Sequence, residues 1–379
     1  MPVSCPTSDE IVAQKLEDGE DATLTLTDMS LFASGAFSNV YRGTAKDDNN
    51  TIMEIVIKKT WPSKKSFPTE VKILGILGKM KHKNVIRLLY SYQKAHSDRI
   101  CLGLIFECIP YNLHQFIKEQ ERQIDIIEVK LITWQLFRGQ AHLQRMKITH
   151  RDIKPQNLLF EPQSGLLKIS DFGSSTDQPA KVAQTSYHVT RYYRPPELIL
   201  GSKHYGPQLD IWSCGCVFGE LLKGGVFLAG SSSDHQGEII FDMIGVPTKE
   251  DLKARQVNKK KYERLAAKYK PDPTKCTLNM AYLFDQKPAF QKERKTRVQN
   301  HRIELSEMKE SVELLRQVLS YNPMKRLCGT DLLMDAYFIE LFDDNTVRYN
   351  NKKIGCITQK DYQNVKNGDR TITHDTTAD

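Results

Sequence analysis

Three short motifs in a fixed order constrain this chain more than any other feature of its sequence. The first is HRDIKPQN, from His150 to Asn157, and it is followed by Asp171-Phe172-Gly173 and then by Pro195-Pro196-Glu197. A single Asp, Asn or Lys in a loop is usually a turn residue or a helix cap. That explanation does not account for eight consecutive motif residues with two further motifs downstream. The sequence therefore predicts a catalytic loop rather than an ordinary turn.

The three motifs resemble the signature set of protein kinases, in which an H-R-D…N loop, a D-F-G triplet and an A-P-E-like triplet occur in this order. The resemblance implies that Asp152 orients a substrate hydroxyl and accepts its proton. It also implies that Asn157 and Asp171 hold two Mg²⁺ ions that bridge the phosphates of ATP. Lys154 would supply a cation near the γ-phosphate, as in serine/threonine kinases. ATP and Mg²⁺ are accordingly the expected cofactors.

A second set of expected ATP contacts lies nearer the N-terminus. Ile55-Val56-Ile57-Lys58 matches the V-A-I-K pattern of the third kinase strand, and Glu70 lies twelve residues further on, in a segment with helical apolar spacing. In isolation such a lysine is usually only a charge at a strand edge. Here we expect a Lys58–Glu70 ion pair that aims the lysine at the α- and β-phosphates.

The stretch FASGAFSNV stands where a glycine-rich loop covers the phosphates in kinases. Only the central glycine, Gly35, is present, because Ala33 and Ser38 occupy the flanking positions. Both replacements raise the cost of positive φ and of close approach to phosphate. The residues expected to contact the nucleotide, in this loop, on the third strand and at the hinge, are Phe32, Ala33, Ser34, Gly35, Ala36, Phe37, Ser38, Asn39, Val40, Val56, Lys58, Phe106, Glu107 and Ile109.

The order of strand-like and helix-like segments predicts an α+β, two-lobed protein kinase fold. We expect a small N-terminal lobe, residues 26–109, with a five-stranded β-sheet and one helix. The larger lobe, residues 110–342, is expected to be mostly α-helical, with a charged insert near residues 249–309. Residues 1–25 and 343–379 are polar without a sustained period, and both are expected to be disordered.

Composition indicates a soluble globular protein. Hydrophobic residues make up 40% and charged residues 26% of the 379 residues. No apolar run is long enough to span a membrane, and the N-terminus lacks the pattern of a secretory signal. Cys101, Cys108, Cys214 and Cys216 lie in apolar segments. We expect them to be buried, reduced thiols of a protein in the cytoplasm or nucleus.

The net charge of +8 is concentrated in one segment. Residues 249–309 contain seventeen Lys or Arg and eight Asp or Glu, which is a surplus of nine. Basic runs of this kind are usually solvated surface, and no nucleic-acid motif accompanies this one. Nucleic-acid binding is therefore the weakest of the functions considered.

The segment RYYRPPELILGSKHYGPQLDIWSCGCVFGELL, which begins at Arg191, is similar to the glycogen synthase kinase 3 (shaggy) family, as are KPQNLLF and DFGS. In that family the tyrosine that matches Tyr187 is phosphorylated by the kinase itself. In kinases the residue that matches Asp210 holds the backbone of the catalytic loop. Arg326 is placed to pair with Glu197.

The chain departs from this family where the family binds a phosphate already present on its substrates. The family uses three basic side chains for that phosphate, and the matching positions here are Thr69, Arg151 and Thr176. Only Arg151 is basic, so we expect a weakened need for a pre-phosphorylated substrate. With Tyr187, Arg151 is also an expected regulatory residue.

The expected function is that of a serine/threonine protein kinase that transfers the γ-phosphoryl group of Mg-ATP to protein hydroxyls. The alternative is a pseudokinase scaffold that binds partners without turnover. A pseudokinase usually lacks at least one member of the set Lys58, Glu70, Asp152, Asn157 and Asp171, and all five are present. Expected partners are ATP, protein substrates and scaffold proteins, for a monomer that binds neither membrane nor nucleic acid.

Overall fold

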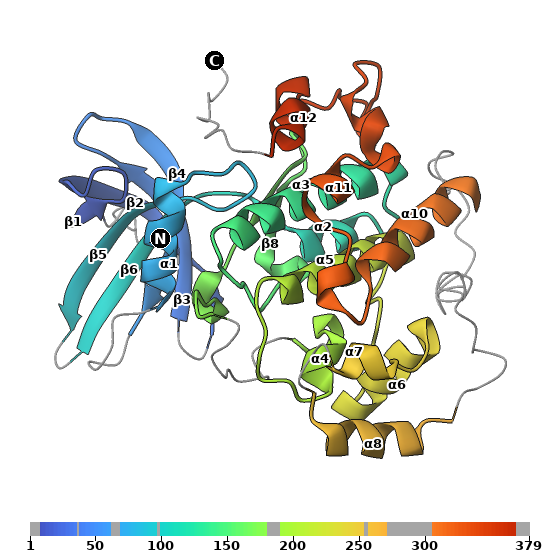
Figure 1. Ribbon diagram of the computed structural model, residues 1–379. Helices are drawn as coiled ribbons and strands as arrows, with labels where there is room; N and C mark the ends of the chain where they lie inside the picture. The colour runs from blue at the N-terminus through green and yellow to red at the C-terminus, as the bar shows by residue number, and fades with distance from the viewer. Residues whose placement is uncertain are drawn as a thin grey trace. The chain divides into compact units, whose positions relative to one another are not determined.

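The computed structural model describes residues 8–35, 38–61, 69–96, 99–179, 190–253, 257–270 and 305–368. The chain forms two compact units, and the second begins at Tyr111. The first unit is rich in strands and the second in helices, as expected for the two lobes of a kinase fold (Figure 1). The division comes one residue after the boundary expected at Ile109.

The first unit is built on six antiparallel strands in the order β1-β2-β3-β4-β6-β5. β1 pairs with β2 along most of its length and with β5 at two residues. The strands are β1 (Asp9–Lys15), β2 (Asp21–Ser34), β3 (Ser38–Lys46), β4 (Ile52–Thr60), β5 (Leu88–His96) and β6 (Arg99–Glu107).

The prediction of five strands and a disordered N-terminal arm is wrong for β1 and the start of β2. β1 buries Ile11 and Ala13, which lie opposite Leu24 and Ala22 of β2. Ile11 and Ala13 are separated by the apolar but exposed Val12, so the sequence lacks the alternation of apolar and polar residues that marks a half-buried strand. The segment becomes a strand because the apolar face of β2 needs a partner, and this need is visible only once the pairing is known.

The core of the first unit lies on one face of β4, and the expected ATP contacts lie on the other. Ile55 and Ile57 are fully buried in a cluster with Ile105 of β6. Because successive side chains of a strand point to opposite faces, Val56 and Lys58 project away from that cluster. Both are half-buried.

The second unit consists of a small sheet and a set of helices around a central one. The sheet has the order β7-β8-β9, with β7 (Tyr111–Asn112), β8 (Leu158–Glu161) and β9 (Leu166–Ile169). None of the helices in the described ranges is both long and apolar enough to cross a membrane. The helices are α2 (Leu113–Glu119), α3 (Ile126–Arg145), α4 (Pro196–Ile199), α5 (Gln208–Lys223), α6 (Ser233–Ile244), α7 (Lys249–Lys253), α8 (Lys259–Lys268), α10 (Leu305–Val318), α11 (Gly329–Leu333) and α12 (Gln359–Lys366).

The central helix is α3, of whose twenty residues seventeen are buried. Asp125 caps its first turn, where the side chain accepts a hydrogen bond from the N–H of Ile127. α5 packs beside it and buries Cys214 and Cys216, whose thiol pKa values are raised by burial. The cysteines of the described residues, including Cys101 and Cys108, are all free thiols.

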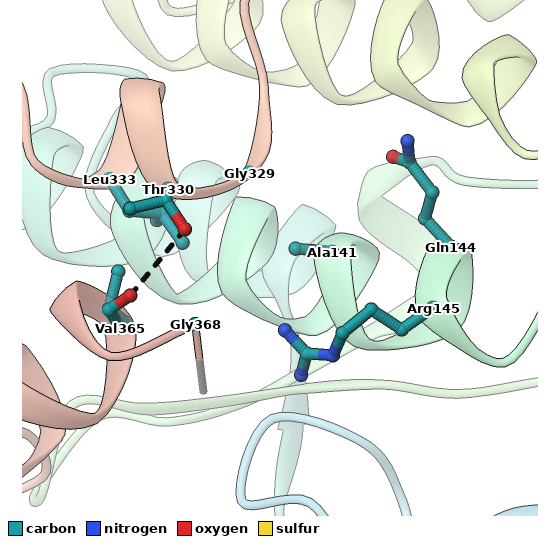
Figure 2. Close-up of a pocket in the computed structure, with 8 residues that line it drawn as sticks. All are labelled: Ala141, Gln144, Arg145, Gly329, Thr330, Leu333, Val365 and Gly368. Carbon is teal, nitrogen blue, oxygen red and sulfur yellow. Dashed lines mark hydrogen bonds between the residues drawn. The ribbon is translucent and has the colours of Figure 1, made fainter. Parts of the chain in front are cut away.

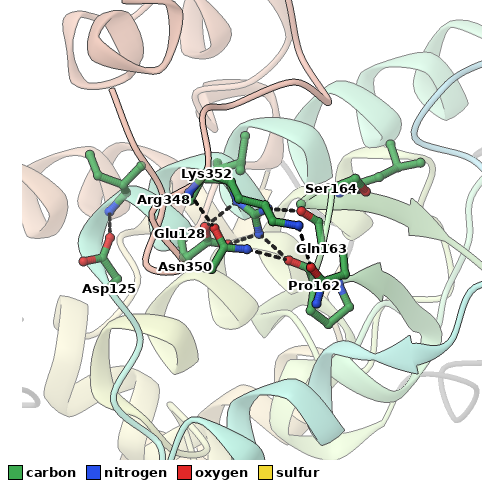
Figure 3. Close-up of polar contacts among 12 residues, drawn as sticks. Asp125, Glu128, Pro162, Gln163, Ser164, Arg348, Asn350 and Lys352 are labelled. Atoms are coloured by element: carbon green, nitrogen blue, oxygen red, sulfur yellow. Dashed lines mark hydrogen bonds and ion pairs between the residues drawn. The ribbon is translucent and has the colours of Figure 1, made fainter. Parts of the chain in front are cut away.

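The prediction of a disordered tail from residue 343 is wrong as far as residue 368. Arg348 is buried and forms an ion pair of 2.7 Å with the buried carboxylate of Glu128 on α3. Its guanidinium also donates to the backbone oxygens of Pro162 and Gln163, as Figure 3 shows. On the same helix, the buried Arg138 pairs with Asp361 of α12 at 2.6 Å.

Because residues 343–368 are mostly polar, their ordered structure could not be predicted from composition. A charged residue is expected to be exposed to solvent unless its partner is known. The partners of Arg348 and Asp361 are Glu128 and Arg138, which lie more than two hundred residues earlier in the chain. Figure 2 shows a further result of the docked tail, a cavity of about 230 Å³ where α3, α11 and α12 meet. It is lined by Ala141, Gln144, Arg145, Gly329, Thr330, Leu333, Val365 and Gly368.

We predict that Arg348→Met lowers the free energy of unfolding by about 3–5 kcal/mol, because it leaves Glu128 buried and unpaired. The matched control is Lys352→Met, which removes a cation from an exposed neighbour and should cost less than about 0.5 kcal/mol. Denaturant unfolding followed by circular dichroism measures both. The double variant Glu128→Leu/Arg348→Met should recover much of the loss, and an Arg348→Met protein as stable as the wild type would contradict the assignment.

Candidate active site

The first unit supplies a lysine that is held by a glutamate. Lys58 near the end of β4 donates to Glu70 in the first turn of α1 (Thr69–Lys79), with Nζ 2.7 Å from Oε1. Both side chains are mostly buried, with 17% and 13% of their surfaces exposed. Leu74, one turn after Glu70, is buried beneath the helix with Ile73. The expected ion pair is therefore confirmed.

The expected phosphate-covering loop is the β2–β3 hairpin. Its turn begins at Gly35, whose N–H donates to the carbonyl of Ser38 at 2.8 Å, and Ser34 bonds Asn39 across the pair. A Cβ on Gly35 would lie 3.6 Å from the nearest atom, an ordinary contact. Other expected loop residues, Phe32 and Ala33, lie on β2 and are exposed. Ala36 and Phe37 lie outside the described residues.

The remaining expected nucleotide contacts share one face of the sheet. Val40 of β3 lies opposite Lys58, and Val56 lies opposite Phe106 of β6. Directly opposite residues of antiparallel strands point to the same face, so these side chains form one surface. After Phe106 the chain leaves the sheet through Glu107 and Ile109, which are half-buried.

In the second unit three side chains converge on the carboxylate of Asp152. Lys154 donates to Oδ2 at 2.7 Å, and the amide of Asn157 donates to the same oxygen at 2.9 Å and to the backbone oxygen of Asp152 at 2.8 Å. Thr190 donates to Oδ1 at 2.7 Å. The donors fix the orientation of the carboxylate, and Lys154 offsets its charge.

Thr190 is the one member of this group that the sequence analysis missed. It lies thirty-eight residues after Asp152, outside the three motifs, and its hydroxyl also accepts a bond from Lys154 at 3.3 Å. A lone threonine before an arginine gives no sequence signal of its own. Only the fold brings it to the catalytic loop.

His150 supports the loop from beneath as a neutral side chain. Its Nε2 lies 2.9 Å from the carbonyl oxygen of Ser170, and its Nδ1 accepts the N–H of Asp152. An acceptor at Nδ1 and a carbonyl at Nε2 assign the proton to Nε2. Burial lowers the pKa of His150, in agreement with this neutral form.

Asp210 of α5 holds the backbone of the same loop, as expected. Its two carboxylate oxygens accept the N–H groups of His150 at 2.6 Å and Arg151 at 2.9 Å. Burial raises the pKa of Asp210 to about 7, and the two backbone hydrogen bonds oppose that rise. The predicted pair of Glu197 and Arg326 is also present, buried and bidentate at 2.7 and 3.0 Å.

Comparison with known proteins agrees with the kinase-like geometry of this site. The protein kinase domain model matches residues 27–338. Glycogen synthase kinase 1 of Pyricularia oryzae is 30% identical over 345 residues, which cover 89% of this chain and 79% of that protein. Protein kinase gsk3 of Schizosaccharomyces pombe is 32% identical over 339 residues (88% and 79%), and serine/threonine-protein kinase RIM11/MSD1 of Saccharomyces cerevisiae is 30% identical over 338 residues (88% and 82%).

The chain is a protein serine/threonine kinase of the glycogen synthase kinase 3 family. Identity near 30% makes it a divergent member of that family. A protein kinase domain uses ATP and a divalent metal, and the pseudokinase alternative gains no support from these relatives.

The kinase offers oxygen donors for a divalent metal. Asp171 lies in the left-handed region with φ of 62°, and its neighbour Ser170 bonds the backbone oxygen of Asn157 through both its N–H and its hydroxyl. These two hydrogen bonds hold the backbone next to Asp171 against the backbone of Asn157. Within the described ranges no three His, Cys, Asp or Glu side chains gather as a metal site. A divalent metal held at these two residues would need further ligands, such as phosphates and water, because the described residues form no closed protein cage.

The three positions expected to match the family's phosphate-binding residues lie in different surroundings. Arg151 donates to the backbone oxygens of Ser174 at 2.5 Å and Ser175 at 3.3 Å. Thr176 is 4% exposed, and its backbone pairs with Thr149 through two hydrogen bonds. Its hydroxyl oxygen accepts a hydrogen bond from the N–H of Gln178. Thr69 is exposed at the first position of α1. Tyr187 lies outside the described residues.

Proposed function

We propose that this kinase transfers the γ-phosphoryl group of Mg-ATP to serine or threonine hydroxyls of proteins, with Asp152 as the group that orients the hydroxyl and accepts its proton. The observation that carries the proposal is the convergence of Lys154, Asn157 and Thr190 on one carboxylate. Fixed donors keep a carboxylate in one orientation, and catalysis of phosphoryl transfer depends largely on positioning and electrostatics.

Lys58 is proposed to hold the α- and β-phosphates, and Glu70 to position Lys58. The short Lys58–Glu70 contact directs the ammonium group and limits its rotamers. The hairpin residues 32–40, with Val56, Phe106, Glu107 and Ile109, are proposed to surround the nucleotide. Their support is the shared sheet face that carries Val40, Val56 and Phe106.

Asn157 and Asp171 are proposed as the residues that hold Mg²⁺. The amide nitrogen of Asn157 is used by Asp152, so its amide oxygen is the atom suited to face a cation. The bound metal would neutralise charge that develops on the phosphate oxygens. Lys154 would stabilise the same charge from the protein side.

We predict that Lys58→Arg and Asp171→Asn each lower the rate of transfer from ATP to a protein substrate by at least about a hundredfold, because both change the charge geometry around the phosphates. The matched control is Lys59→Arg, which alters the adjacent lysine, stacked on Tyr41, and should retain activity. Radiolabelled ATP measures transfer, and thermal melting checks that each variant is folded. Full activity in a folded Lys58→Arg or Asp171→Asn protein would overturn the assigned roles.

We propose further that the kinase has a weak preference for pre-phosphorylated substrates. A phosphate with nearly two negative charges needs several converging donors, and arginine binds it best. Two of the three matching positions carry neutral threonines, and the Thr176 hydroxyl is buried and already accepts a hydrogen bond. The Arg151 guanidinium is engaged with carbonyl oxygens.

The test of this proposal is a pair of peptides that differ only by phosphate on the serine four residues after the target. We predict a preference for the phosphorylated peptide below about a hundredfold in kcat/KM, equivalent to about 2.7 kcal/mol. A peptide with alanine at the target is the blank. A larger preference would show that the two threonines do not weaken the site. Self-phosphorylation of Tyr187 stays a prediction.

A further inference from the structure

Helix α8 is strongly basic on the face that it does not bury. Its sequence, KKKYERLAAK, holds five cations and one carboxylate. Leu265 anchors it in a cluster with Leu200 and Phe241. The side chains of Arg264 and Lys268 remain 57% and 60% exposed. Figure 1 shows α8 along one end of the second unit, next to α6.

Cations from two different parts of the chain meet at the first turn of α6. Arg194 donates to the hydroxyl of Ser233 at 3.3 Å. Arg264 and Lys268 contact the next residue, Asp234, at 3.1 and 3.9 Å. This turn also carries the partial positive charge of a helix N-terminus, so one carboxylate faces a larger positive charge.

Lys261 adds a fourth cation to this group, which we name the α8 basic cluster: Arg194, Lys261, Arg264 and Lys268. The N–H of Asn258 bonds the carbonyl of Leu200, which fixes the start of α8 beside the end of α4. Lys261 is half-buried there, and its pKa is lowered by burial and by the charges of Arg194 and Arg264, while Asp234 opposes the change. Among the described residues, the cluster thus places four cations around the carboxylate of Asp234.

One member of the α8 basic cluster, Arg194, lies close along the chain to Thr190, which contacts the proposed acceptor site. Thr190 bonds Asp152, and Arg194 follows only four residues later, after the short helix Arg191–Tyr193. Four residues span at most about 14 Å. A peptide whose hydroxyl lies at Asp152 can therefore bring residues a few positions from that hydroxyl to Arg194.

We infer that the α8 basic cluster binds acidic or phosphorylated residues that flank the target hydroxyl in the protein substrate; the inference rests on the proposed function. Charge complementarity makes an anionic peptide the fitting occupant. A nucleic acid fits less well, because single strands are held by exposed aromatic rings and those of this region are engaged. Tyr262 is half-buried in the apolar cluster, and Tyr269 packs on Phe241 and donates to Asp242.

The experiment compares peptides with one target serine flanked, on one side or the other, by four Asp, four Asn or two phosphoserines. For the wild type we expect a KM at least about fivefold lower for an Asp peptide than for its Asn counterpart, with similar kcat, from several weak ion pairs. Arg264→Gln/Lys268→Gln should reduce this ratio below about twofold. The matched control is Lys360→Gln/Lys366→Gln on α12, which loses the same charge from exposed sites at the opposite end of the unit and should keep the ratio.

Binding is measured separately by fluorescence anisotropy of the labelled peptides on the Asp152→Asn protein, which needs no turnover. Binding of the Asp peptides that depends on Arg264 and Lys268 supports the inference, whether or not the peptides are phosphorylated. A lack of phosphorylation alone would count against the proposed function and not against the inference. A preference for the phosphoserine peptides only would also support it and identify phosphate as the ligand. Equal KM and equal binding for the Asp, Asn and phosphoserine peptides would overturn it, as would a preference for the Asp or phosphoserine peptides that is unchanged in Arg264→Gln/Lys268→Gln. Binding of labelled RNA through α8, without peptide binding, would overturn it as well.

Discussion

The carboxylate of Asp210 is the group on which the geometry of the catalytic loop depends. It is 1% exposed and accepts the consecutive N–H groups of His150 and Arg151. Arg151 has φ of 69°, a left-handed conformation that costs a residue with a side chain of order 1–3 kcal/mol. The two hydrogen bonds offset this cost. The turn that they hold directs Asp152 toward Lys154, Asn157 and Thr190.

The buried ion pairs are of two kinds: one kind orients a side chain of the proposed active site, and the other joins distant segments of the chain. Lys58–Glu70 orients a side chain expected to meet phosphate, whereas Glu197–Arg326 and Glu128–Arg348 join distant parts of the second unit. Buried pairs of the second kind contribute little net stability relative to apolar residues, but a single lost partner is costly. They therefore specify which segments dock together. The docking of residues 343–368 on α3 is specified in this way.

The sequence was sufficient to predict a contact where both of its partners belong to recognisable motifs. The Lys58–Glu70 and Glu197–Arg326 pairs and the role of Asp210 could be predicted because each partner stands in a recognisable motif. Thr190, β1 and Arg348 could not. Thr190 belongs to no motif. The apolar residues of β1, Ile11 to Ala13, are consecutive and do not alternate with polar ones. Arg348 is expected to be a surface charge unless Glu128 is known to lie beside it. In each case the missing information is a long-range contact rather than a local preference.

We conclude that the charge and hydrogen-bond arrangement around Asp152 makes this chain an active protein kinase. The most direct measurement is transfer of radiolabel from γ-labelled ATP to an oriented library of serine- and threonine-containing peptides, with Asp152→Asn as the blank. We predict that the wild type labels the library and that the folded Asp152→Asn protein does not. Equal labelling by both proteins, or none by the wild type with Mg²⁺ present, would contradict it.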